Sequence, residues 1–85
     1  MYLSIINVQP LKDYKLLLEF ENDEKRIFDM KPFLNYGRYS ELKNINLFKL
    51  VRVSFDAIEW PNELDLDPEF LYNKSLSIEN ERRSL

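Results

Sequence analysis

The chain contains no cysteine, no histidine and no threonine, and it has one glycine among its 85 residues. Small secreted domains generally depend on disulfides, so the lack of cysteine favours a reducing compartment, and we predict a cytoplasmic protein. Without imidazole and thiol groups, the common general bases and nucleophiles of enzymes are missing. The six serines have no G-x-S-x-G motif around them. We therefore expect no catalytic residues, no metal site and no cofactor.

Long apolar runs and clusters of positive charge are absent as well. No apolar stretch approaches the roughly 20 residues that cross a bilayer, and residues 1–7 lack the features of a signal peptide. The 12 lysines and arginines are dispersed and the net charge is −3, whereas binding a phosphate backbone requires several cations on one face. We expect neither a membrane protein nor a chain that binds nucleic acid by itself.

The sequence does contain enough apolar material for one hydrophobic core. Hydrophobic residues make up 45% of it and aromatic residues 14%. A chain of this length buries only about 60–65% of the surface that it exposes when unfolded, so the core has to be used efficiently. No linker, repeat or low-complexity stretch divides the chain. We predict a single α+β domain over residues 1–76 and a flexible C-terminal tail over residues 77–85.

The first part of the chain has the pattern of β-strands. The apolar run of residues 3–8 predicts a strand that ends at Pro10. Residues 14–20 alternate at period two, with one face apolar and the other half polar, and residues 25–30 alternate in the same way. Short polar segments rich in Asn and Asp separate these runs and predict turns. Together the patterns predict an antiparallel three-stranded meander.

Short helices are expected next. Pro32 is placed to begin a helical turn, which Tyr36-Gly37 would end with the glycine as a left-handed cap. Asn46 is placed to cap a further helix. The apolar face of that helix would carry Leu47, Leu50 and Val51.

The last part of the folded chain predicts a strand pair and a helix. Residues 52–55 and 57–60 look extended on either side of a turn at Asp56. The order Asp67-Pro68-Glu69 is typical of a helix start, with Asp as the cap and Pro at the first helical position. The expected fold is therefore α+β: a small antiparallel sheet, made of a three-stranded meander plus a later strand pair, with two or three short helices.

Four segments follow one another in an order that is more specific than composition. They are Asp13–Pro32, Phe48–Val53, Ile58–Asn62 with its Trp-Pro-Asn triplet, and Asp65–Tyr72. In this order the chain resembles the bacterial domain-of-unknown-function family 2442 over residues 6–72. It departs from the family's pattern at Glu63, where relatives commonly have glycine, so the turn at that position can differ.

The resemblance implies an α+β fold in a bacterial protein with no established activity. Some relatives carry a helix-turn-helix domain after this one, which suggests regulation, but too few residues follow Tyr72 for such a domain. Other relatives resemble the products of small genes that lie beside the gene of a second small protein, an arrangement that suggests toxin–antitoxin pairs. A protein partner or self-association is therefore expected.

Two interpretations remain open for the acidic run made of Glu63, Asp65, Asp67 and Glu69. Alternating carboxylates can bind a ligand or act as an acid and base pair, although the glycine and bidentate glutamate of a calcium loop are missing. The structural interpretation, which we favour, makes Asp67 a helix cap. It gives Asp65 either an ion pair with Arg52 or backbone hydrogen bonds in a turn.

Aromatic residues are the other candidates for a site, because they concentrate binding energy at interfaces. The segment Tyr36-Gly37-Arg38-Tyr39 looks like a loop, and it is our first choice for a binding patch. For Trp60 we favour a place in the core, with the polar end of its ring exposed to solvent, over a place on a binding surface. The candidate binding residues are Tyr36, Arg38, Tyr39, Trp60, Asn62, Asp65 and Asp67.

Two classes of function remain. The first is a small protein-interaction module, either the antitoxin-like partner of a neighbouring small protein or a homodimer; the aromatic segment, the acidic balance and the open edges of a small sheet favour it. The second is a small-ligand binder or enzyme that uses the acids from Asp65 to Glu69, and it requires a concave pocket that contains them. An accessory domain in transcription regulation is a further alternative.

Overall fold

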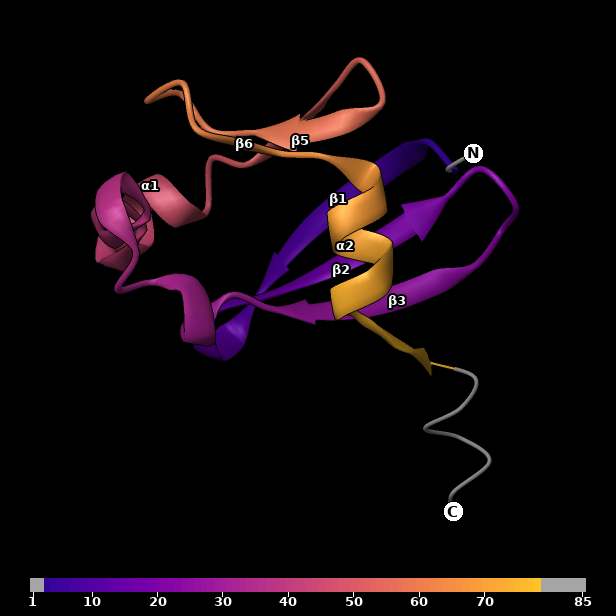
Figure 1. The fold of residues 1–85 in the computed structure, drawn as a ribbon, viewed down its shortest axis with the longest axis horizontal. Coiled ribbons are helices and arrows are strands. Elements are labelled where there is room, and N and C mark those ends of the chain that lie inside the picture. Colours follow the sequence, from indigo (N-terminus) through magenta and orange to yellow (C-terminus); the bar gives the residue numbers. More distant parts are fainter. Residues whose placement is uncertain (1–2, 79–85) are drawn as a thin grey trace.

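Two antiparallel sheets and several short helices make up residues 3–78, the part of the chain that the computed structural model describes (Figure 1). The strands are β1 (Ile5–Leu11), β2 (Lys15–Phe20), β3 (Lys25–Asp29), β4 (Arg52–Ser54), β5 (Ala57–Glu59), β6 (Asp65–Leu66) and β7 (Leu76–Ser77). The 3₁₀ helices are η1 (Lys12–Tyr14), η2 (Lys31–Phe33) and η3 (Gly37–Lys43), and the α-helices are α1 (Ile45–Phe48) and α2 (Pro68–Lys74). The predicted α+β fold is confirmed.

The meander predicted from the alternating pattern forms the larger sheet. Its strand order is β1-β2-β3-β7, and β1, β2 and β3 pair antiparallel in sequence order. In β2 the buried side chains are Leu16, Leu18 and Phe20, while the residues between them are partly exposed. The period-two pattern therefore gave the correct face of this strand.

The first strand begins later than predicted, at Ile5, and extends past its predicted end. We expected it to end at Pro10, but β1 continues to Leu11, and Pro10 pairs with Leu16. Since β1 lies at the edge of the sheet, Pro10 can stay in the strand without removing a hydrogen bond from a central ladder.

The 3₁₀ helix η3 replaces the loop expected after Tyr36. Pro32 lies at the start of η2, as predicted, and Gly37 has the expected positive φ, at 50°. However, Gly37 begins η3 instead of ending the first turn, so Arg38 and Tyr39 lie in a helix and not in a loop. The hydroxyl of Ser40 donates to the carbonyl of Gly37, which supports this first turn.

The helix expected after Asn46 is shorter and begins earlier. Asn44 is its cap, because the Asn44 side chain accepts a hydrogen bond of 3.0 Å from the Asn46 backbone. The helix ends at Phe48, which is buried, and Leu50 beyond it is 58% exposed. The predicted apolar face was therefore wrong at Leu50, since a helix of four residues does not extend far enough to turn that side chain inward.

The predicted strand pair of the second half is confirmed as the β4–β5 hairpin, and β6 extends it to the order β4-β5-β6. The expected helix start is also confirmed, because the Asp67 side chain accepts a hydrogen bond of 2.7 Å from the Phe70 backbone. Glu63 has a φ of 71°, the left-handed conformation that glycine adopts most easily. Because this chain has glutamate where relatives commonly have glycine, the backbone of Glu63 is strained in the turn before β6.

The strand β7 was not predicted. Its two residues pair with β3 at the edge of the larger sheet, where Ser77 lies opposite Arg26. We assigned residues 77–85 to a tail; of these, residues 79–85 lie outside the described part.

One hydrophobic core joins the two sheets and the helices. Figure 1 shows α2 lying across one face of the larger sheet, with the smaller sheet along one side. The Ile5 backbone donates a hydrogen bond of 3.1 Å to the Asp56 carbonyl, which ties β1 to the β4–β5 turn. The largest fully buried side chains are Trp60, Phe20, Phe28 and Phe48. In residues 3–78 no helix is both long and apolar enough to cross a membrane.

Candidate functional site

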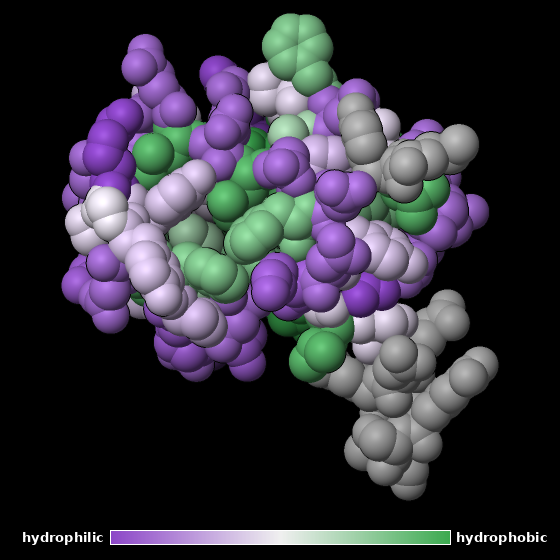
Figure 2. Space-filling view, viewed as in Figure 1, coloured by the Kyte–Doolittle hydropathy of each residue, from purple (hydrophilic) through white to green (hydrophobic). Residues whose placement is uncertain are grey.

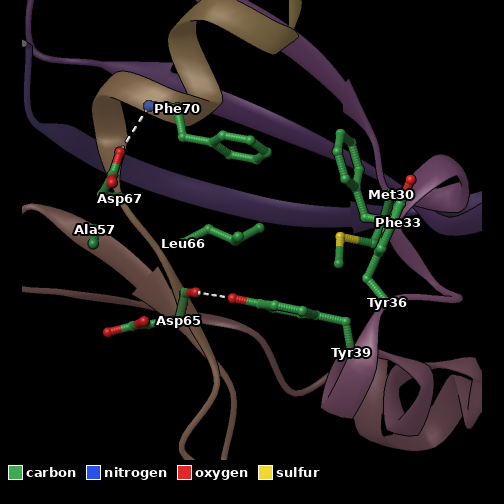
Figure 3. Close-up of a pocket in the computed structure, with 9 residues that line it drawn as sticks. All are labelled: Met30, Phe33, Tyr36, Tyr39, Ala57, Asp65, Leu66, Asp67 and Phe70. Carbon is green, nitrogen blue, oxygen red and sulfur yellow. Dashed lines mark hydrogen bonds between the residues drawn. The ribbon is translucent and has the colours of Figure 1, made fainter.

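A pocket of about 460 Å³ opens where η2, η3, β6 and the start of α2 meet (Figure 3). Its lining is mainly aromatic and apolar. The residues that line it are Met30, Phe33, Tyr36, Tyr39, Ala57, Asp65, Leu66, Asp67 and Phe70. Figure 2 shows hydrophobic side chains gathered on this face of the molecule, with hydrophilic ones around them.

The positions of the two phenylalanines follow from the two proline-initiated helices. Pro32 lies at the start of η2, directly before Phe33 at its end, while Pro68 begins α2 and leaves Phe70 in the first turn. The two rings meet edge to face with their centroids 5.4 Å apart. The buried ring of Phe28 lies against both, stacked on Phe33 at 5.5 Å and edge-on to Phe70 at 6.0 Å. Core packing therefore holds this wall of the pocket in place.

Tyr36 and Tyr39 form another side of the pocket, and they differ in exposure and in hydrogen bonding. Tyr36 is 66% exposed, and its ring centroid lies 6.5 Å from that of Phe33. Tyr39 is half-buried, and its hydroxyl donates a hydrogen bond of 2.7 Å to the backbone carbonyl of Asp65. Burial raises the pKa of the Tyr39 hydroxyl, and the negative charges of Asp65 and Asp67 raise it further. Tyr39 therefore remains a hydrogen-bond donor at neutral pH.

The two acids of the pocket have different surroundings. Asp67 caps α2, as described above. The Asp65 side chain is exposed and points away from the Tyr39 ring (Figure 3). Its carboxylate makes no hydrogen bond or ion pair with the residues that the structure describes. The expected pairing of Asp65 with Arg52 is wrong: Arg52 binds Glu59 at 3.0 Å, on the neighbouring strand.

The acidic run as a whole does not come together. Glu63 lies in the turn before β6 and Glu69 in the first turn of α2, and neither lines the pocket. Across residues 3–78, no three acidic side chains are placed to hold a metal ion. The alternating spacing therefore distributes these carboxylates over a turn, a strand and a helix start.

Arg38 and Asn62 lie beside the pocket in a separate polar cluster. Arg38 donates a hydrogen bond of 2.7 Å to the Asn62 carbonyl and contacts Glu41 at 3.3 Å. The Asn62 side chain donates to the same Glu41 carboxylate at 2.8 Å. The hydrogen bond from Asn62, followed by that from Arg38, lowers the pKa of Glu41. This cluster joins η3 to the turn between β5 and β6.

Trp60 is a core residue, which is the interpretation that we favoured. Its side chain is 1% exposed. The polar end of the ring is not exposed to solvent as expected, however, because the buried indole nitrogen donates a hydrogen bond of 3.0 Å to the Phe48 carbonyl. The ring therefore fixes α1 against β5 and does not face the pocket.

Of the predicted site residues, the structure brings four together in the pocket: Tyr36, Tyr39, Asp65 and Asp67. The apolar residues that complete the pocket were not predicted. These are Met30, Phe33, Ala57, Leu66 and Phe70. For Phe33 and Phe70 the available signal was a helix-starting proline one or two residues before the aromatic residue.

A further surface residue was missed on the hairpin next to Ala57. Phe55 is 98% exposed and has a φ of 55° at the first position of the two-residue β4–β5 turn. Asn, Asp and Gly are the usual residues with this conformation in such turns. A bulky aromatic residue at a turn position of this kind is the signal that could have identified it.

These observations define a small α+β domain whose two sheets and helices enclose an aromatic pocket with acids at its wall. The family described as protein of unknown function (DUF2442) matches residues 5–77, and the chain belongs to that family. The resemblance inferred from the four segments is thereby confirmed. No match was found among curated proteins or among solved structures.

Proposed function

We propose that this protein is a protein-interaction module that binds its partner through the aromatic pocket. The observation that carries the proposal is the exposed ring of Tyr36 beside a preformed wall of Phe33 and Phe70. Aromatic side chains dominate the energy of protein interfaces, and pockets that need no rearrangement bind at lower cost. A partner side chain inserted here would meet rings that the core already orders.

The exposed Phe55 supports the same proposal. Ala57, two residues further on, lines the pocket, so the β4–β5 turn lies close to it. A fully exposed aromatic residue in a strained backbone conformation raises the free energy of the isolated folded chain. Contact with a partner would offset part of that cost by burying the ring.

Two kinds of partner fit the proposal. One is a small protein encoded beside this one, which would make the chain antitoxin-like; the family resemblance supports this choice. The other is a second copy of the chain. A role in transcription regulation would use the same docking, with the DNA contacts made by the partner, since the chain carries a net charge of −3. The lack of cysteine supports a place in the bacterial cytoplasm.

The second candidate function is binding of a small ligand. The pocket volume of about 460 Å³ supports it, because small-molecule sites generally measure about 300–1,000 Å³. Asp65 and Asp67 belong to the wall, as this hypothesis requires. Against an enzyme stands the placement of the two acids, because Asp67 caps α2 and the Asp65 carboxylate points away from the Tyr39 ring (Figure 3).

Site-specific cross-linking in the native cell tests the proposal. A photo-reactive benzoylphenylalanine would replace Tyr36 at the pocket, and in a control it would replace the exposed Asn22 in the β2–β3 turn. We expect one discrete adduct from position 36, to a partner protein or to a second copy, and none from position 22. A chain that stays monomeric and yields no adduct from position 36 would exclude a docking role for the pocket.

A further inference from the structure

The charged residues that line the pocket have one sign. Asp65 and Asp67 belong to its wall, whereas no lysine or arginine among the described residues does. The nearest arginine in sequence is Arg38, which is engaged with Glu41 and with the Asn62 carbonyl. Within residues 3–78, the wall of the pocket therefore contains no cation to balance these carboxylates.

Both carboxylates keep capacity for a ligand. That of Asp65 makes no hydrogen bond or ion pair within residues 3–78, and that of Asp67 accepts one hydrogen bond, from the Phe70 backbone. An ionised carboxylate can accept about four hydrogen bonds. Their charges act on the pocket, since both raise the pKa of the Tyr39 hydroxyl there. A positive group at the rim would find acceptors that residues 3–78 leave open.

The interior of the pocket has a different character from its rim. Phe33, Leu66 and Phe70 point into it, and the ring of Tyr39 closes one side (Figure 3). An apolar side chain gains free energy by entering such a space, while a charged group would lose part of its hydration there. The best ligand therefore carries an apolar part for the interior and a positive charge for the rim.

Resting on the proposed function, we propose that the pocket binds a partner segment in which an apolar anchor side chain lies next to a basic residue. The anchor fills the space between Phe33, Leu66 and Phe70, and the basic residue pairs with Asp65 and Asp67 at the rim. Segments with an acidic residue at that place are repelled. The rim charges thus select among partners more than they add to affinity.

Three probes that share one apolar part and differ in charge test this inference: 4-phenylbutylammonium, 4-phenylbutanol and 4-phenylbutyrate. Each is titrated into ¹⁵N-labelled protein while amide shifts are followed. We expect shifts around the pocket with dissociation constants on the order of millimolar for molecules of this size. The cation should bind about threefold to tenfold more tightly than the anion, with the alcohol between them, because exposed ion pairs contribute little each.

A charge-neutral variant provides the matched control. Asp65→Asn combined with Asp67→Asn removes both charges, and asparagine retains the helix cap. In this variant the three probes should bind within about twofold of one another, since the remaining affinity comes from burial of the shared phenyl group. A preference for the cation that survives in the variant would overturn the role assigned to the two carboxylates.

The other outcomes separate this inference from the proposed function. Equal binding of all three probes to the wild-type pocket would overturn the charge preference and would still support the pocket as a docking site. Micromolar binding of the ammonium probe would make the pocket a small-amine site and overturn the partner-segment inference. Shifts outside the pocket, or none, would overturn it as well, while the cross-linking from position 36 decides the docking role independently.

Discussion

The hydroxyl of Tyr39 donates a hydrogen bond of 2.7 Å to the backbone carbonyl of Asp65, 26 residues later in the chain. This bond joins η3 to β6 at the side of the aromatic pocket. It directly links the two segments that we singled out from the sequence, the tyrosine segment and the acidic run. The link uses the backbone of Asp65 and not its carboxylate, which leaves that carboxylate available.

Removal of this hydroxyl should destabilise the protein slightly. We expect Tyr39→Phe to lower the free energy of unfolding by about 1 kcal/mol, because one partly buried hydrogen bond is lost and the ring remains. Urea unfolding measures the change. Tyr36→Phe is the matched control, because no hydrogen bond within the described residues involves the hydroxyl of the exposed Tyr36, and its stability should be that of the wild type. Equal losses in the two variants would contradict the role of the Tyr39 bond.

Asp67 should act on stability as a cap and not through its charge. Asp67→Ala is expected to cost about 1 kcal/mol, whereas Asp67→Asn should be nearly neutral, since asparagine caps helices about as well as aspartate. Thermal or urea unfolding compares the two. If Asp67→Asn destabilised the protein as much as Asp67→Ala, the carboxylate charge would matter more to the fold than the bond to Phe70.

Acid should weaken the fold through Glu24. This carboxylate binds Arg26 at 2.6 Å and accepts the hydroxyl of Tyr72 at 2.9 Å. A hydrogen bond from Asn22, followed by those from Tyr72 and Arg26, lowers the pKa of Glu24 below its ordinary value of 4.5. The stabilisation is therefore complete above pH of about 4.5 and is lost as the pH falls through the lower pKa of the folded state.

The measurement is urea unfolding as a function of pH, compared with Glu24→Gln. The variant cannot lose a charge at this position, so its stability should change less than that of the wild type as the pH falls below about 4.5. The ring of Tyr72 also packs under the Arg26 guanidinium at 4.1 Å, and that contact should persist in acid. Identical pH dependence in the two proteins would show that Glu24 is not among the groups responsible.

Phe55 should carry backbone strain. Its φ of 55° disfavours every residue with a β-carbon, so Phe55→Gly should be more stable than Phe55→Ala by about 1 kcal/mol. Both variants remove the exposed ring, and the difference between them isolates the backbone. Chemical unfolding of the pair gives the value. A glycine variant no more stable than the alanine variant would show that the turn has a different conformation.

The sequence was most informative where a regular pattern had enough length to show. The alternation of residues 14–20 gave the buried face of β2, and Asp67-Pro68-Glu69 gave the start of α2. By contrast, β6 and β7 contain two residues each, too few to show any period. Their pairing depends on where the rest of the chain places them, which is a tertiary effect that local preference does not report.

The candidate site was predicted in part for the same reason. Tyrosines and aspartates stand out in a sequence because their chemistry suggests a role, and four of them line the pocket. Phe33, Leu66 and Phe70 looked like ordinary core residues, since an apolar side chain in a pocket and one in the core have the same local pattern. What distinguishes them is a gap between segments far apart in the chain, and only the fold shows it.

The most direct test of the docking role is the amount of partner that co-purifies with Tyr36→Ala relative to the wild type. Tyr36 is largely exposed, so the variant should unfold at nearly the same denaturant concentration. Truncation of an aromatic residue at the centre of an interface lowers the affinity at least about tenfold. We therefore predict that Tyr36→Ala recovers only a small fraction of the wild-type amount of the partner that cross-linking identifies. Recovery of the same partner in undiminished amount, from a variant that folds normally, would contradict the account.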